Sequence, residues 1–163
     1  MAAVDYFLKL DDIKGESTDD KHKGEIELMS WSWGAHQTGT AGVGGGAGAG
    51  KVSKEDFRFM KRTDKSSPNL MIACATGQHF KQAIMTARKA GGGQQEYLKM
   101  TLSDVIVSGY NTEGTGDAGS PVPLEHVSFN FTKLELSYKP QKPDGSLDAE
   151  VKQTYDFGAN KKI

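Results

Sequence analysis

Gly45 to Lys51, with the sequence Gly-Gly-Ala-Gly-Ala-Gly-Lys, match the first seven positions of a phosphate-binding P-loop. In a P-loop the next residue is Ser or Thr, which holds magnesium, but here it is Val52. A P-loop also opens a helix whose N-terminal amides face the phosphates, whereas the residues after Lys51 alternate as in a strand. Glycine-rich runs match this motif easily by chance, so the sequence argues against nucleotide binding.

Cys74 and His79 are the one neighbouring thiol–imidazole pair that could act as nucleophile and base. Cys74 lies in the apolar run 70–75, which is typical of a small buried core residue. His79 follows the end of a predicted helix, so the two side chains need not face each other. The other histidines, which lack metal-ligand spacing, are His22, His36 and His126. We therefore expect no catalytic site, no metal and no cofactor.

Two pairs of adjacent carboxylates, Asp11–Asp12 and Asp19–Asp20, contain the residue types of an acid–base pair. Adjacent side chains on a strand or an extended loop point in opposite directions. We therefore expect these carboxylates to form solvated charge clusters.

Residues 30–34 read Ser-Trp-Ser-Trp-Gly. In a strand, both tryptophans face one side, while Ser30 and Ser32 face the other. The paired indoles indicate that these two tryptophans pack into the hydrophobic core and anchor the strand there. The opposite face then carries small polar groups, which can lie close to a large partner without repelling it. A plain solvent-facing sheet is the alternative interpretation.

The charges are balanced, with 20 basic and 21 acidic side chains in 163 residues. This balance argues against nucleic-acid and membrane-surface partners. A single cysteine excludes an internal disulfide and fits a reducing cytoplasm. The N-terminus has no basic leader, and no apolar run approaches the roughly 20 residues that cross a bilayer. We expect one domain over residues 1–163, no membrane insertion, and no cleaved signal peptide if the protein is exported.

Alternation of apolar residues predicts strands at 4–10, 25–34, 56–62, 83–89, 96–102, 105–110, 124–138 and 151–157. One short helix is expected at about 68–76, with Ser67 as N-cap and Gly77 as a left-handed stop. A phase change within 124–138 indicates a strand that passes from one sheet to another. The sequence predicts a mainly β fold: a compact β-barrel or two-sheet sandwich of about eight or nine antiparallel strands, with an extended glycine-rich loop at about 34–51.

Eight of the 17 residues from Gly34 to Gly50 are glycine. This composition fits a disordered surface loop. It also fits an arm that becomes ordered when it binds a neighbouring subunit. The predicted helix is apolar on all sides over 70–75, so it needs cover on more than one side. A neighbouring subunit could supply part of that cover.

Several segments, in their order and spacing, resemble a known family over essentially the whole chain. They are residues 5–10 with 13–17, 31–34 leading into the glycine-rich loop, 64–71, 88–92, 96–98 and 138–141. The family is that of the haemolysin-coregulated protein (Hcp), the tube subunit of bacterial type VI secretion systems.

This resemblance implies a compact β-barrel with a flanking helix that assembles into homo-hexameric rings. The rings stack into a tube inside a contractile sheath and beneath a spike protein. The lumen carries and protects effector proteins. The subunits are made in the cytoplasm, are themselves ejected to the extracellular space, and have no enzymatic activity.

We hypothesise that Ser30 and Ser32 line the lumen and contact effectors. We also hypothesise that residues 41–51 contact an adjacent ring or subunit. The residues singled out in this segment are Val43, Gly44, Gly45, Gly46 and Lys51. Two other functions remain open: a monomeric binding module that grips a ligand with the glycine-rich loop, and a nucleotide- or thiol-dependent enzyme.

Overall fold

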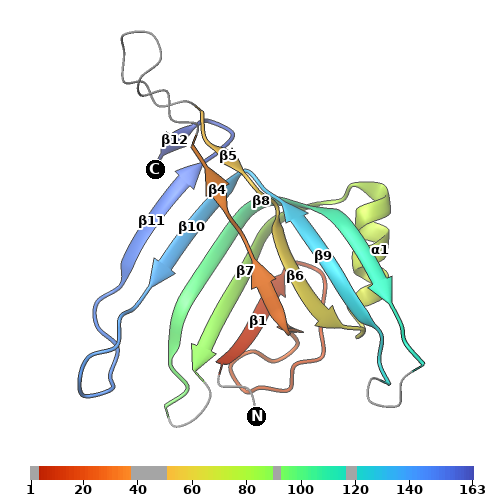
Figure 1. Cartoon of the computed structure of the whole chain (residues 1–163), viewed down its shortest axis with the longest axis horizontal. Coiled ribbons are helices and arrows are strands. Elements are labelled where there is room, and N and C mark those ends of the chain that lie inside the picture. The colour runs from red at the N-terminus through yellow and green to blue at the C-terminus, as the bar shows by residue number, and fades with distance from the viewer. Residues whose placement is uncertain (1–3, 38–50, 90–92, 117–120) are drawn as a thin grey trace.

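The computed structural model describes residues 4–37, 51–89, 93–116 and 121–163. These residues form strands and one helix, α1 (Ser67–Thr76) (Figure 1). The strands are β1 (Val4–Leu10), β2 (Ile26–Leu28), β3 (Ser30–Ser32), β4 (Ala35–His36), β5 (Ser53–Lys54), β6 (Phe57–Arg62), β7 (His79–Lys89), β8 (Glu96–Glu113), β9 (Leu124–Asn130), β10 (Lys133–Tyr138), β11 (Val151–Asp156) and β12 (Lys161–Lys162).

Ten of these strands form one antiparallel sheet, in the order β12-β11-β10-β8-β7-β1-β2. A branch continues from β8 through β9 and β6 to β3, while β4 and β5 pair separately. The expected mainly β, antiparallel fold with one short helix is therefore confirmed. The sheet is not closed into a barrel, because Met29 separates β2, which pairs with β1, from β3, which pairs with β6.

The segment 25–34, which was expected to be one strand, changes its pairing partner at Met29. The backbone N–H of Met29 donates to the carbonyl oxygen of Met60 at 2.8 Å, so the chain stays attached to β6 where it leaves β1. One predicted strand is thus two short ones, each with its own neighbour.

The longest strand is β8, with 18 residues, although the sequence suggested two strands there. Its first part lies between β7 and β10, and its last part pairs with β9. The register of the β8–β9 pair shifts between Val107 and Gly109, which is the bulge geometry that bends a strand. The expected strand at 124–138 is instead divided into β9 and β10, which pair with different parts of β8.

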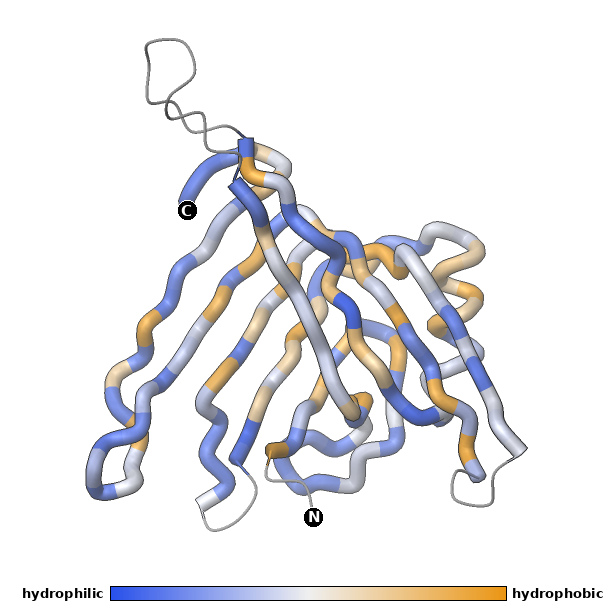
Figure 2. The backbone as a smooth tube through the Cα atoms, viewed as in Figure 1, coloured by the Kyte–Doolittle hydropathy of each residue, from blue (hydrophilic) through white to orange (hydrophobic). Residues whose placement is uncertain are grey.

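The hydrophobic core is formed by the inward side chains of the strands. Leu70 and Ala73 of α1 are also part of it. Figure 2 shows apolar and polar residues alternating along the strands, as expected for strands with one buried face. The largest fully buried apolar side chains include Phe57, Phe129, Phe131, Met85 and Met100.

Helix α1 begins at Ser67, and its N-cap is Ser66 rather than the expected Ser67. The Ser67 hydroxyl instead points into the protein and accepts a hydrogen bond from the backbone N–H of Asp64 at 3.0 Å. The left-handed stop is confirmed, since Gly77 has φ of 68°. No helix in the described ranges is long and apolar enough to cross a membrane.

Candidate functional surfaces

Ser30 and Ser32 lie on an exposed, mostly polar face of the sheet, which we call the serine face. It consists of the outward side chains of β3, β6, β9 and the end of β8. Cross-strand pairing forms one row from Ser32 through Arg58 to Ser128, and a second from Ser30 through Met60 to His126. A shallow depression of about 320 Å³ runs over both rows.

The two tryptophans between and beside these serines face inward, as expected, and hold β3 in place. The Trp31 ring stacks on Phe57 with centroids 6.0 Å apart, and packs edge-on against Tyr6. The Trp33 ring packs against Phe131 and Phe157 at 6.2 and 6.1 Å. Strand alternation then directs both serines outward.

A buried ionic network lies beneath the serine face. The Nζ atom of Lys61, whose side chain is 0% exposed, lies 2.7 Å from Oε1 of Glu125. It also donates to the Ser67 hydroxyl at 3.1 Å and pairs with Asp64 at 3.0 Å. The Tyr110 hydroxyl donates to the second oxygen of Glu125 at 2.6 Å. The network therefore joins β6, β8 and β9 to the start of α1.

Burial alone would raise the pKa of Glu125. Hydrogen bonds from Lys61, Tyr110 and Ser67 outweigh that effect, so the pKa is lowered. Burial, and then the hydrogen bond to Glu125, raise the pKa of Tyr110 to about 12. The favoured state is an ionised Glu125 that accepts hydrogen bonds from Lys61 and from the neutral phenol of Tyr110. This arrangement suits a structural link between the strands.

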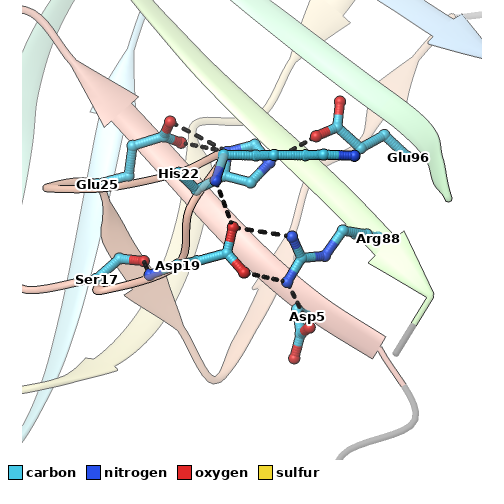
Figure 3. A network of polar contacts seen from close by, with 8 residues as sticks. Asp5, Ser17, Asp19, His22, Glu25, Arg88 and Glu96 are labelled. Carbon is cyan, nitrogen blue, oxygen red and sulfur yellow. Dashed lines mark hydrogen bonds and ion pairs between the residues drawn. The ribbon is translucent and has the colours of Figure 1, made fainter. Parts of the chain in front are cut away.

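A second network attaches the loop between β1 and β2 to the sheet (Figure 3). The ring of His22 lies between Glu25, 3.0 Å from Nδ1, and Glu96, 2.6 Å from Nε2. It stacks on Phe7 with centroids 4.3 Å apart. These contacts leave His22 only 6% exposed.

Arg88 forms the other half of this network. Its guanidinium donates to both carboxylate oxygens of Asp19, at 3.0 and 2.7 Å, and to Asp5 at 3.1 Å. The hydrogen bond from Arg88 lowers the pKa of Asp19 to about 2. The expectation of a solvated charge cluster is therefore wrong for Asp19. Neither half of the network could be predicted from local patterns, because Glu96 and Arg88 lie far along the chain from their partners.

The glycine-rich segment is described only at its two ends. Val43, Gly44, Gly45 and Gly46 lie outside the described residues, while Lys51 is exposed. The flanking strands β4 and β5 pair with each other, so both ends of the segment emerge side by side (Figure 1). Residues 51–66 contain strands and no helix, so a P-loop is not formed in this part of the chain.

The thiol–imidazole pair is not assembled. Cys74 is half-buried on α1, while the exposed His79 faces Asp104, with Nδ1 3.4 Å from Oδ1. Within the described ranges, no three His, Cys, Asp or Glu side chains are arranged to hold a metal ion.

Two apolar patches are exposed on opposite sides of the molecule. The helix patch consists of Met71 and Ile72 on α1, which are 47% and 49% exposed. The strand patch consists of Leu136, Tyr138 and Val151 on β10 and β11, which are 42%, 47% and 61% exposed. Tyr138 and Val151 are direct cross-strand partners, so these side chains share one face. In Figure 1, α1 and the β10–β11 pair form opposite edges.

Comparisons with known proteins agree with this architecture. The family model described as "Type VI secretion system effector, Hcp" matches residues 7–138. The protein hcp1 of Pseudomonas aeruginosa is 50% identical over 147 residues, which is 90% of each chain.

Solved structures are similar as well. The crystal structure of Hcp1 from Salmonella typhimurium superposes with a TM-score of 0.83 and 41% identity, covering 99% of this chain and 100% of that one. Another, titled "Structure of a type six secretion system protein", has a TM-score of 0.92 and 31% identity, with coverage of 99% and 100%. The chain therefore belongs to the Hcp family of type VI secretion system proteins.

Proposed function

We propose that this chain forms homo-hexameric rings that stack into the inner tube of a type VI secretion system and carry effector proteins in the lumen. The observation that carries the proposal is the pair of uncovered apolar patches at opposite edges, with the serine face between them. In this function the chain is a structural component without catalytic activity.

The positions of the patches favour a ring over a two-fold dimer. A two-fold interface uses the same patch on both copies. Contact between two different patches instead repeats head to tail and gives a ring when the rotation between neighbouring copies closes. The strand patch of one copy covers the helix patch of the next. Large apolar side chains that are about half exposed in an isolated subunit are then buried in the assembly, and α1 gains the cover on more than one side that its apolar sequence predicts.

The serine face supplies the lumen surface. Ser30 and Ser32 contact effectors there, because short polar side chains allow a folded protein to approach the sheet closely. The row from Ser32 through Arg58 to Ser128 repeats in every subunit of the ring. A lumen built this way is lined by polar groups over the buried aromatic layer of Trp31 and Phe57.

Residues 41–51 contact an adjacent ring or subunit. The support for this role is that β4 and β5 bring both ends of the segment together at the end of the molecule that also carries β12 (Figure 1). The stacked tube lies within a contractile sheath and beneath a spike protein. The subunits are synthesised in the cytoplasm and leave with the tube, without a cleaved signal peptide.

Substitutions in the two apolar patches test the ring contact. Leu136→Asp and Ile72→Asp each place a charge in an apolar interface, so both should reduce the hexamer to smaller species in light scattering. Val122→Asp is the matched control, because Val122 is also exposed, at 37%, but lies in neither patch. Hexamers that persist in both patch variants would contradict the proposed contact.

Ser32→Gln tests the lumen role. The longer side chain fills part of the depression on the serine face, so rings should keep their mass but retain less of a co-expressed effector of the same secretion system. Ser53→Gln makes the same change at an exposed serine outside the depression and should retain effector normally. Equal retention by the two variants would argue against effector contact at Ser32.

A further inference from the structure

Arg58 is the one long cationic side chain that lines the depression on the serine face. Its cross-strand neighbours are Ser32 on β3 and Ser128 on β9, and the residue beyond Ser128 is Gly109 on β8. These neighbours are short, so the guanidinium has nothing of its own length beside it in this row. The charged group of Arg58 is therefore flanked in this row by the hydroxyl groups of Ser32 and Ser128.

The guanidinium of Arg58 forms no hydrogen bond or ion pair within the described chain. This distinguishes it from Arg88, whose guanidinium is bound by Asp19 and Asp5. The nearby carboxylate of Asp56 accepts instead from Ser108 at 2.7 Å and Asn130 at 3.2 Å. The positive charge of Arg58 is therefore left free to bind an external group.

We propose that Arg58 makes the serine face selective for cargo that presents aspartate or glutamate side chains. A guanidinium carries a planar fork of N–H donors that binds both oxygens of one carboxylate, which a lysine cannot do with the same geometry. The hydroxyl groups of Ser32 and Ser128, which flank Arg58, can donate to the same carboxylate. The inference rests on the proposed function, since it assigns the chemistry of the cargo that the serine face contacts.

The ring strengthens the effect. Six copies place six unpaired guanidinium groups around one lumen, so an acidic cargo surface meets several of them at once. Repeated weak contacts on one scaffold give much tighter binding than any single one. Cargo with a basic surface is disfavoured, because like charges brought together cost free energy.

The proposal can be tested with a fluorescein-labelled peptide of alternating glutamate and serine, measured by fluorescence anisotropy on purified rings at about 0.15 M salt. A peptide with glutamine in place of glutamate is the matched probe without charge. Wild-type rings should bind the glutamate peptide more tightly than the glutamine peptide. Arg58→Gln should weaken binding of the glutamate peptide by roughly tenfold, because it removes charge-assisted hydrogen bonds. Arg58→Lys should restore only part of the affinity.

Arg62→Gln is the control variant. Arg62 is the next arginine on the same face of β6 and is exposed. Its guanidinium also forms no hydrogen bond or ion pair within the described chain, but it does not line the depression. It should leave peptide affinity unchanged. Equal losses in the Arg58 and Arg62 variants would overturn the proposal, because they would show general charge attraction. So would a short single-stranded DNA that binds at Arg58 more tightly than the glutamate peptide.

The two proposals fail in different ways. If Ser32→Gln loses a co-expressed effector while Arg58→Gln binds the glutamate peptide as well as wild type does, the lumen role stands and the selectivity does not. If neither rings nor effector retention are found, the proposed function fails. If the protein is then a monomer that binds the glutamate peptide through Arg58, this result would still support an acidic partner for the serine face.

Discussion

Replacing Lys61 with methionine should destabilise the fold by about 3–5 kcal/mol. Methionine has a similar shape, so the loss comes mainly from leaving the Glu125 carboxylate, 1% exposed, in a buried site without its cation. For a chain of this length, 1 kcal/mol lowers Tm by roughly 2–4 °C. The expected fall in Tm is therefore roughly 6–20 °C.

Urea unfolding measures this effect, at one protein concentration because assembly stabilises the folded state. Lys81→Met, at an exposed position of β7, is the control and should change stability by less than about 0.5 kcal/mol. The double variant Lys61→Met/Glu125→Leu should be more stable than Lys61→Met alone, because it removes the uncompensated charge. A loss below about 1 kcal/mol for Lys61→Met, or a double variant weaker than the single one, would refute this reasoning.

Three further predictions follow from particular contacts. Gly15→Ala should cost about 1–3 kcal/mol or more in urea unfolding, because its Cβ would lie 2.5 Å from a backbone oxygen, whereas Gly114→Ala meets nothing within 4 Å and should be near neutral. Tyr110→Phe removes a hydrogen bond to the Glu125 carboxylate and should cost about 1.5–3 kcal/mol; an unchanged urea midpoint would contradict this. The pKa of Asp19 is lowered to about 2, so its contribution to stability is present above about pH 4 and is lost as the pH falls through about 2. Asp19→Asn should flatten the dependence of the unfolding free energy on pH in that window, and an unchanged slope would rule the contribution out.

Local patterns in the sequence were sufficient to predict most elements. Alternation placed β1, β6 and β11 closely, and Pro68 with Gly77 bounded α1 to within one residue. The inward orientation of Trp31 and Trp33 followed from spacing alone, since strand geometry fixes it. These features depend on neighbours in sequence.

Features that depend on distant contacts were not predictable. The break at Met29 arises because β1 and β6 compete for successive parts of one segment. The buried networks join residues up to 83 positions apart, as between Asp5 and Arg88, so no local spacing reveals them. The exposure of the strand patch was not predictable either: Leu134 and Leu136 share one face of β10, yet Leu134 is 6% exposed and Leu136 is 42% exposed.

The mass of the wild-type protein in solution tests the central claim most directly. Light scattering coupled to size-exclusion chromatography, repeated over a dilution series, should give six times the chain mass of 17.6 kDa, or about 106 kDa. A mass that stays near 17.6 kDa at all concentrations would contradict ring assembly and would favour a monomeric binding module.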